Sequence, residues 1–292
     1  MFRFFVCFLP LLSLCAFSNA EPECGISEYP IPPTSHRIIN GTLVKKGELP
    51  WVTAISIVFQ SKRAFGCTGS IISRNHVLLA AHCCDDPYAT YFIKFGTNDK
   101  NDEHAVNRLT TKVHLHNDYI EYKQHDIAIL EFDGPLNYDE NIRPICLKKT
   151  FNESESEKRA LSSGFGAKKF FKCPPHGPCY TPPGASDGKL HRGSESFIPQ
   201  QECDQKFQSQ VNTTEFICAK GFNGTDTFKG DRGGPLSVKN PERSDGKVQW
   251  MQVGISSFGD SNYPIKLSAF TRVSLYCDWI AKTTKNAATC RD

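Results

Sequence analysis

Short runs of apolar and β-branched residues recur along the chain, separated by Gly, Pro, Asn and Asp. Many short runs with frequent turn residues predict an all-β fold of the sandwich or barrel type. The clearest runs are 51–59, 70–79, 91–95, 109–115, 127–132, 249–256 and 269–273. One segment, 275–287, has the pattern of a helix, with Ile280 and Ala281 close to Cys277. The pattern therefore predicts a β-rich chain that ends in a helix.

The first 20 residues have the layout of a signal peptide. Arg3 precedes an apolar run over 4–17, and the small residues Ser18 and Ala20 follow at the positions that a signal peptidase reads. A membrane anchor is the alternative, but a spanning helix needs about 20 apolar residues, and charge resumes at Glu21. We therefore expect a secreted, extracellular chain that begins near Glu21, with no membrane span.

Length, charge and cysteine content further limit the class of protein to which this chain can belong. About 270 residues remain after a signal peptide, enough for one large β domain. The formal net charge is only +3, so nothing in it points to nucleic acid. Of the 13 cysteines, Cys7 and Cys15 lie in the signal segment. The other cysteines, an odd number, indicate disulfides in a secreted protein, with at least one thiol left over.

Two stretches have the composition of loops. Residues 151–159 are rich in Ser and Glu, and residues 168–193 carry five prolines, four glycines and two cysteines. A loop of the second length inside a compact domain is usually functional or partly disordered.

Three segments gain meaning when they are considered together: Ala80-Ala81-His82-Cys83, then Asp126-Ile127-Ala128, then Gly230-Asp231-Arg232-Gly233-Gly234-Pro235. Taken singly, the first segment would be explained by a structural histidine, the second by an aspartate in a turn, and the third by a tight glycine loop. In this order they resemble the trypsin and chymotrypsin family of serine proteases. Arg37-Ile38 resembles the activation junction of that family, and Ser163-Gly164-Phe165-Gly166 resembles its Ser-Gly-Trp-Gly.

The resemblance implies an all-β fold of two six-stranded antiparallel β-barrels with a C-terminal α-helix. It divides the chain into a propeptide at 21–37, a protease domain at 38–283 and a tail at 284–292. Within the domain, barrel one would span about 38–148, barrel two about 149–274 and the helix about 275–287.

By the same resemblance His82 is the base, Asp126 its orienting partner, and position 232 the serine nucleophile. Arg232 stands there instead. A guanidinium has no acceptor lone pair and does not deprotonate in proteins. Loss of the nucleophile lowers turnover by about a million-fold in another protease with this triad. A positive neighbour also disfavours the imidazolium form of His82.

Other positions match the substrate-binding and activation residues of the family. Asp226 matches the pocket-base aspartate behind Lys and Arg preference, and Ser268 stands where many members have a pocket glycine. Residues Ser257, Phe258 and Gly259 resemble the strand that pairs with a bound peptide. The backbone N–H groups of Gly230 and Arg232 would form the oxyanion hole. Cleavage after Arg37 would free the ammonium of Ile38 to insert beside Asp231.

The resemblance also implies disulfides. These are Cys67–Cys83, Cys203–Cys218 and Cys24–Cys146, the last tethering a propeptide, and a local Cys173–Cys179 loop is expected within the insertion. Cys84, Cys277 and Cys290 remain. An unbroken helix would separate Cys277 and Cys290 by about 20 Å, so they cannot pair unless the helix ends first.

Sequons and histidines complete the candidate sites. Asn152, Asn212 and Asn223 begin Asn-x-Ser/Thr sequons and are expected to be glycosylated, whereas Asn40 lies beside the activation site. His104, His114, His116 and His125 would allow a zinc site, but His116-Asn117-Asp118-Tyr119 resembles an ordinary family loop. We therefore expect no metal and no cofactor.

Three functional hypotheses follow. The first is a non-catalytic protease homologue that binds a protein or peptide partner, such as a protease, a protease inhibitor or a peptide ligand. The second is an active serine-type endopeptidase cleaving after Lys or Arg, which requires Arg232 to be a variant or an error, or a rescue by another hydroxyl. The third is an adhesive surface protein that uses the insertion at 168–193.

Overall fold

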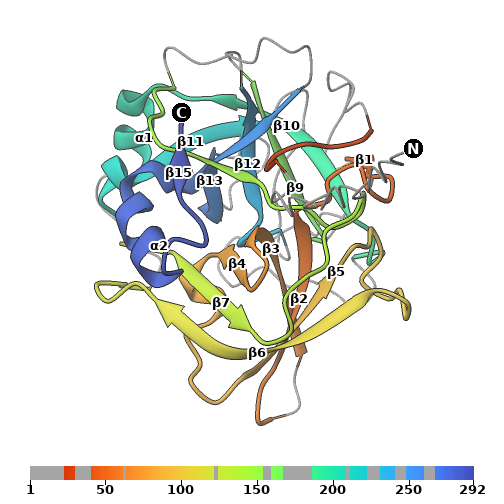
Figure 1. The fold of residues 1–292 in the computed structure, drawn as a ribbon. Coiled ribbons are helices and arrows are strands. Elements are labelled where there is room, and N and C mark those ends of the chain that lie inside the picture. Colours follow the sequence, from red (N-terminus) through yellow and green to blue (C-terminus); the bar gives the residue numbers. More distant parts are fainter. Residues whose placement is uncertain are drawn as a thin grey trace, which may run out of the picture.

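The computed structural model describes most of the chain (Figure 1). The described residues are 23–29, 41–61, 64–121, 124–153, 159–166, 186–207, 211–221, 231–240, 248–259 and 267–292. None of the helices in these ranges is long and apolar enough to cross a membrane.

Six antiparallel strands close the first barrel, in the order β2-β3-β4-β7-β6-β5. They are β2 Val52–Val58, β3 Ala64–Ser73, β4 His76–Leu79, β5 Thr90–Phe95, β6 Val106–Leu115 and β7 Ala128–Phe132. Burial alternates along β5, as in a half-buried strand, whereas every residue of β4 is buried. In β5, for example, Tyr91, Ile93 and Phe95 are buried and Thr90 and Phe92 are exposed.

The second barrel follows the order β12-β9-β10-β11-β14-β13, and the pairing of β12 with β13 closes it. Its strands are β9 Arg159–Gly164, β10 His191–Phe197, β11 Phe216–Gly221, β12 Pro235–Lys239, β13 Trp250–Gly259 and β14 Leu267–Arg272. Three short strands extend this sheet: β1 Thr42–Leu43 on β10, β8 Cys146–Lys148 on β13, and β15 Cys290–Arg291 on β8. The prediction of two six-stranded antiparallel barrels is confirmed.

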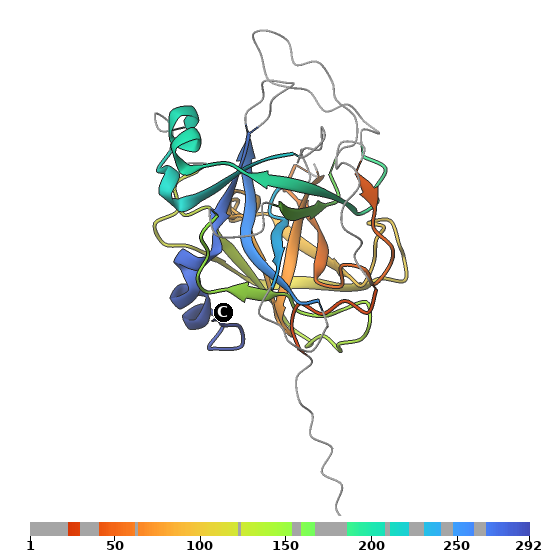
Figure 2. The same ribbon diagram turned by 90° about the horizontal axis from the view of Figure 1, so that it is seen from above.

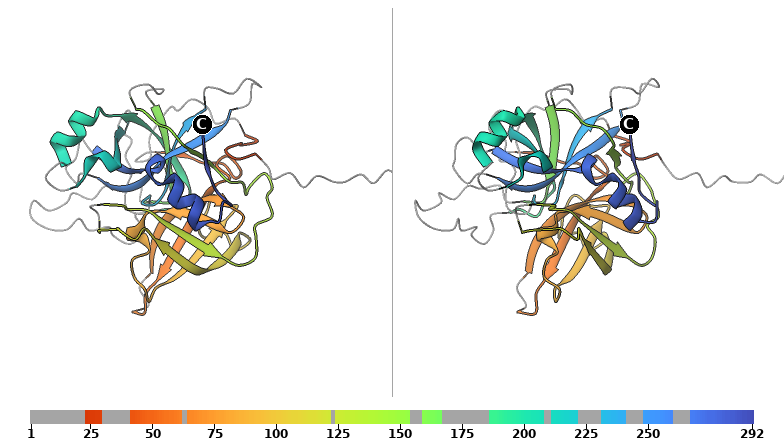
Figure 3. Two further views of the ribbon diagram at one scale, coloured as in Figure 1. Left: turned by 60° about the vertical axis from the view of Figure 1, so that its left-hand side comes forward. Right: turned by 90° about the vertical axis from the view of Figure 1, so that its left-hand side faces the viewer.

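The two barrels lie one against the other, with the first below the second in Figure 3. One cluster of buried side chains runs from Trp51 and Phe95 in the first barrel to Leu161 and Trp250 in the second, and on to Ile280 near the C-terminus. A shared close-packed core fixes the position of one barrel relative to the other. Residues from both barrels can therefore form one site.

Few helices accompany the barrels. Within the described residues they are η1 Ala81–Cys83, α1 Gln200–Phe207, η2 Thr213–Glu215, η4 Val273–Tyr276 and α2 Cys277–Thr283. The sequence pattern did not predict α1, which lies at the outer side of the second barrel (Figure 2).

The C-terminal helix differs from the predicted segment 275–287. A 3₁₀ turn precedes it, and α2 ends at Thr283. Lys285 and Asn286 adopt left-handed backbone conformations with φ of 52° and 64°, which an α-helix cannot contain. The chain therefore turns back early, and the condition for pairing Cys277 with Cys290 is met. Their disulfide joins Cα atoms 5.5 Å apart.

The structure also forms the three disulfides that the resemblance implied in the described residues: Cys24–Cys146, Cys67–Cys83 and Cys203–Cys218. Cys173 and Cys179 lie outside the described residues. Cys84 is a buried free thiol.

Two other predicted boundaries change. The apolar run 70–79 contains the end of β3 and all of β4, which join through a turn at Arg74 and Asn75. The proposed loop 168–193 is too long at its end, because His191 begins β10 and pairs with Gly164. The polar sequence of β10 hid the strand: His191, Arg192, Ser194 and Glu195 are all buried.

Candidate active site

Residues from both barrels meet at the candidate site. His82 lies on η1, which follows β4, and Asp126 lies just before β7. Since β4 and β7 are neighbours, with Leu79 opposite Ala128, the ends of these strands bring the two residues together. The second barrel contributes Ser257 from β13 and Arg232 from the turn before β12.

The side chains of His82 and Asp126 are joined as the resemblance led us to expect. Oδ2 of Asp126 lies 2.8 Å from Nδ1 of His82, and Oδ1 accepts a hydrogen bond of 2.9 Å from the backbone N–H of His82. A carboxylate on Nδ1 favours the tautomer whose proton sits on that nitrogen. Nε2 is then the nitrogen that could accept a proton.

Two hydroxyl groups of the second barrel hold Asp126 in place. Oγ of Ser257 donates to Oδ2, and Oγ1 of Thr271 donates to the backbone carbonyl at 2.8 Å. Burial by itself would raise the pKa of this fully buried carboxyl. The charge of His82 and the hydrogen bonds from His82 and Ser257 outweigh burial, so the pKa of Asp126 lies below its ordinary value.

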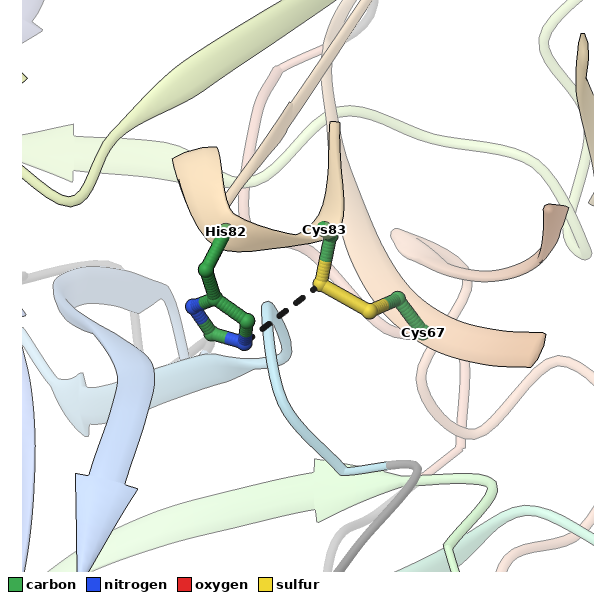
Figure 4. A group of neighbouring side chains, drawn as sticks. All are labelled: Cys67, His82 and Cys83. Carbon is green, nitrogen blue, oxygen red and sulfur yellow. Dashed lines mark hydrogen bonds between the residues drawn. A yellow bond between two sulfur atoms is a disulfide. The ribbon is translucent and has the colours of Figure 1, made fainter. Parts of the chain in front are cut away.

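The imidazole of His82 is shielded from solvent, with 2% of its side chain exposed. Its Nε2 faces the Cys67–Cys83 disulfide and lies 3.8 Å from Sγ of Cys83 (Figure 4). The backbone carbonyl of Arg232 lies 3.9 Å from the same sulfur. The imidazole of His82 and the backbone carbonyl of Arg232 therefore both approach the sulfur of Cys83.

The turn that carries Arg232 is fixed to both barrels. The backbone carbonyl of Arg232 accepts a hydrogen bond of 2.9 Å from the N–H of Thr68 on β3. The N–H of Gly233 donates a hydrogen bond of 2.8 Å to the backbone carbonyl of Ser256 on β13. Gly233 has φ of +81°, and a Cβ there would lie 2.4 Å from the carbonyl oxygen of Thr68. Only glycine can adopt this φ without strain and also avoid the contact with the Thr68 carbonyl oxygen. Arg232 itself is partly exposed.

The carboxylate of Asp231 is buried behind this turn, with 1% of the residue exposed. Oδ1 accepts a hydrogen bond of 2.8 Å from the N–H of Gly166. A Cβ at Gly164 would lie 2.3 Å from this oxygen, and one at Gly166 would lie 2.6 Å from it. The two glycines of Ser-Gly-Phe-Gly therefore make room for the Asp231 carboxylate.

The peptide-strand candidates occupy the end of β13. Ser257 is fully buried, Phe258 is partly buried and Gly259 is exposed. Gly259 pairs with Ser268 of β14, which is buried. The ring of Phe258 packs edge-on against Phe207 and Phe216, with centroids 5.3 Å and 5.1 Å away. Phe258 therefore helps to attach α1 to the second barrel.

Several predicted site residues lie outside the described residues: Gly230, Asp226, Arg37, Ile38, Asn223 and Asn40. Their roles as oxyanion donor, pocket base, activation junction and sequons stay predictions. Asn152 and Asn212 are described and exposed, so a glycan would have access to both.

The family model described as Trypsin matches residues 38–280 of this chain. The chain belongs to the trypsin family.

Proteins with similar sequences include an ovochymase, a CLIP domain-containing serine protease and a proclotting enzyme. Ovochymase of Halocynthia roretzi is 29% identical over 89% of this chain, but this chain covers only 16% of that protein. The CLIP domain-containing serine protease B10 of Anopheles gambiae is 28% identical, covering 90% of this chain and 72% of the relative. The proclotting enzyme of Tachypleus tridentatus is 27% identical, covering 91% and 74%.

Solved structures show the same fold. Neuropsin, a serine protease expressed in the limbic system of mouse brain, superposes with a TM-score of 0.66 at 23% identity, covering 84% of this chain and 98% of neuropsin. HL collagenase superposes with a TM-score of 0.69 at 24% identity, covering 85% and 99%.

Sequence reasoning missed two residues that support Asp126. It assigned Ser257 to peptide binding and gave Thr271 no role in the site. Both lie more than 100 positions away from Asp126. No local pattern links them to it, because closure of the second barrel brings them there.

Proposed function

We propose that this member of the trypsin family is a secreted, non-catalytic homologue that acts by binding a protein or peptide partner. The observation that carries the proposal is Arg232, at the position whose backbone carbonyl approaches the same Cys83 sulfur as the His82 imidazole. An arginine side chain cannot attack a carbonyl, because it has no lone pair to offer.

Within the described residues, the hydroxyls of Ser257 and Ser237 do not replace the missing nucleophile. Oγ of Ser257 donates to Asp126 Oδ2, the oxygen that also contacts Nδ1 of His82. It is therefore on the side of the imidazole opposite Nε2, where a general base would take a proton. Ser237 is buried within β12, between β9 and β13.

The rest of the machinery supports a binding role rather than decay. The His82–Asp126–Ser257 network and the glycines around Asp231 and Thr68 are all in place. We infer that cleavage after Arg37 would still release the Ile38 ammonium toward Asp231. Such a step would let proteolysis switch the peptide-binding surface at 257–259 between two states.

The partner that fits this proposal is a protease, a protease inhibitor or a peptide ligand. Signal-like residues 1–20, four disulfides within the described residues and two exposed sequons favour secretion. Relatives include a proclotting enzyme and a clotting factor G beta subunit. A regulatory role in an extracellular protease cascade is therefore the setting that we propose.

The decisive experiment compares three forms of the chain, each cleaved after Arg37 and assayed on Lys and Arg amide substrates. The natural chain is expected to show no turnover above a blank. Arg232→Ser restores a nucleophile, and Arg232→Ala removes the cation without supplying one. Turnover by the natural chain close to that of an active trypsin-like enzyme would overturn the proposal.

The variants then separate two causes of inactivity. Activity in Arg232→Ser but not in Arg232→Ala would show that the nucleophile alone was lost. Inactivity of both would place a second defect in the pocket, where Ser268 and the segment around Asp226 are the candidates.

The intact His82–Asp126–Ser257 network also supports the second candidate, an active endopeptidase cleaving after Lys or Arg. That function requires serine at 232. Sequencing codon 232 from independent individuals tests it directly, and a serine codon would favour the enzyme.

A further inference from the structure

A second group of polar side chains lies outside the candidate active site, where the loop between β6 and β7 meets the C-terminal segment. His116 follows β6, and His125 immediately precedes Asp126. Backbone hydrogen bonds between Ile120 and Gln124, of 3.0 Å and 3.1 Å, make this loop a hairpin. The hairpin brings the two imidazoles into a stack with centroids 4.6 Å apart and an angle of 16° between the rings.

We propose that His116, His125 and Asp118 form a binding site for a divalent transition-metal ion of the zinc class. One ligand atom from each residue lies within 4.8 Å of the others. Two imidazole nitrogens and a carboxylate are a ligand set that zinc uses, with a fourth position left for water or for a partner's side chain. The same group would not suit calcium, which prefers oxygen ligands.

The surroundings of His125 are those of a supported metal ligand. Its Nδ1 lies 3.2 Å from the hydroxyl of Tyr276 and 3.5 Å from Oε2 of Glu215. Metal-binding histidines commonly have one ring nitrogen held by a carboxylate or another polar group, which fixes the tautomer and the ring orientation. Here that arrangement would leave Nε2 of His125 as the ligand atom.

The backbone of His125 supports the same conclusion. It has φ of 53°, in the left-handed region that non-glycine residues rarely adopt. Its N–H donates to Oε2 of Glu215 at 2.9 Å, and Glu215 Oε2 also accepts from Tyr276 at 3.2 Å. A strained conformation held by a buried carboxylate is a reason to look for function at the residue.

The remaining two ligands would complete the site with small movements. Nδ1 of His116 accepts a long hydrogen bond of 3.3 Å from the N–H of Asp118, so this nitrogen carries a lone pair. Oδ2 of Asp118 lies 4.0 Å from it, and the Asp118 side chain is 77% exposed. Zinc bonds of about 2.0–2.2 Å require the stacked rings to tilt toward each other and the carboxylate to turn inward.

A bound ion would lie where three parts of the fold meet. Its ligands belong to the hairpin before Asp126, and Tyr276 and Trp279 of the C-terminal segment contact His116 at centroid distances of 5.4 Å. Glu215 comes from η2 of the second barrel. The ion would therefore cross-link the two ends of the hairpin where it contacts the C-terminal segment and η2 of the second barrel, independently of whether Arg232 abolishes catalysis.

The test is calorimetric titration of the disulfide-intact full chain with ZnCl₂, together with the visible absorption spectrum of the Co²⁺ form. We expect one ion per chain, and His116→Gln or His125→Gln should weaken binding at least tenfold. Asp118→Asn should weaken it too, and because Asp118 is exposed this variant should keep the fold. Tyr276→Phe should weaken it by about 10-fold or more, as loss of a supporting contact does.

His104→Gln is the matched control. His104 precedes the opposite end of β6 from His116, and its loss should leave affinity unchanged. The proposal is overturned if the chain binds no zinc at millimolar concentration, or if His116→Gln, His125→Gln and Asp118→Asn all bind as tightly as the natural chain. Loss of binding in His82→Gln alone would assign the ion to the candidate active site and would also overturn it.

Discussion

Nδ1 of His82 and Oδ2 of Asp126 lie 2.8 Å apart, and only 2% and 0% of the two side chains are exposed. A buried carboxylate that is this well paired is stabilised in its ionised form. Folding stability is therefore linked to its protonation, whether or not the pair takes part in catalysis.

Asp126→Asn should change how stability depends on pH. The pKa of Asp126 is lower in the folded chain than its ordinary value of 3.8, so the ionised form stabilises the folded chain fully above that value. The contribution is lost as the pH falls from the unfolded pKa toward the folded pKa. The natural chain should thus exceed the variant in stability near neutral pH, and the difference should shrink on acidification through about pH 4 and below.

Urea unfolding midpoints of both proteins between about pH 7 and about pH 3 measure this difference. Subtracting the two curves removes the groups that do not contact Asp126, so the remaining pH dependence belongs to the Asp126–His82 pair. A difference that stayed constant over the whole range would contradict the expected depression of the Asp126 pKa.

Gly233→Ala should destabilise the turn that carries Arg232. The new Cβ would lie 2.4 Å from the carbonyl oxygen of Thr68, at a φ of +81°. We expect a loss of more than about 1 kcal/mol, the cost of forcing an L residue into this conformation, seen as a lower midpoint of thermal unfolding. Gly66→Ala is the control, because its Cβ would meet nothing closer than 3.8 Å. Equal midpoints for the two variants would argue against this account of Gly233.

Removing the C-terminal disulfide should weaken the fold. Cys277 and Cys290 enclose a separation of 13 residues, and the double variant Cys277→Ser with Cys290→Ser should lose about 3 kcal/mol, as expected for a loop of this size. Peptide mapping without reduction should recover the two cysteines in one linked fragment. Recovery of Cys290 in an unlinked peptide would show that the chain does not turn back after Thr283.

Cys84 should react slowly with iodoacetamide in the native protein. Burial, and then the nearby carboxylates of Asp126 and Asp85, raise the pKa of its thiol well above the ordinary value, and the thiolate is the reactive form. Mass spectrometry should find Cys84 unmodified after native labelling and alkylated after labelling in denaturant. Fast native labelling would mean that the residue is accessible.

Much of the first barrel was predictable, because apolar runs such as 91–95 and 127–132 mark strands that carry buried side chains. The run 70–79 was predicted as one strand, because apolar residues flank the turn at Arg74 and Asn75. Strand β10 was hidden by its buried polar side chains, including Glu195, which accepts a hydrogen bond from Ser162 at 2.8 Å. The buried side chains of such a strand are polar and form hydrogen bonds with one another or with their neighbours. A search for apolar residues at regular spacing therefore does not predict the strand.

Some residues of the candidate site could likewise be predicted from the sequence, and others could not. His82, Asp126 and the 230–236 segment could be located because each lies within a short motif. The contacts of Asp126 with Ser257 and Thr271 had no local signal. Likewise, Glu215 and Tyr276 lie 90 and 151 positions from His125 in the sequence, and only the closed barrels bring them to it.

The disulfide between Cys24 and Cys146 spans 122 positions and joins the segment before the proposed Arg37 junction to the body of the protein. The same segment adds backbone hydrogen bonds of 2.8 Å from Gly25 to Pro144 and from Trp250 to Gly25. Cleavage after Arg37 would therefore produce two polypeptides that remain one covalent molecule. Gel filtration would not register the event, and a short light chain would separate only on an electrophoresis gel run after reduction.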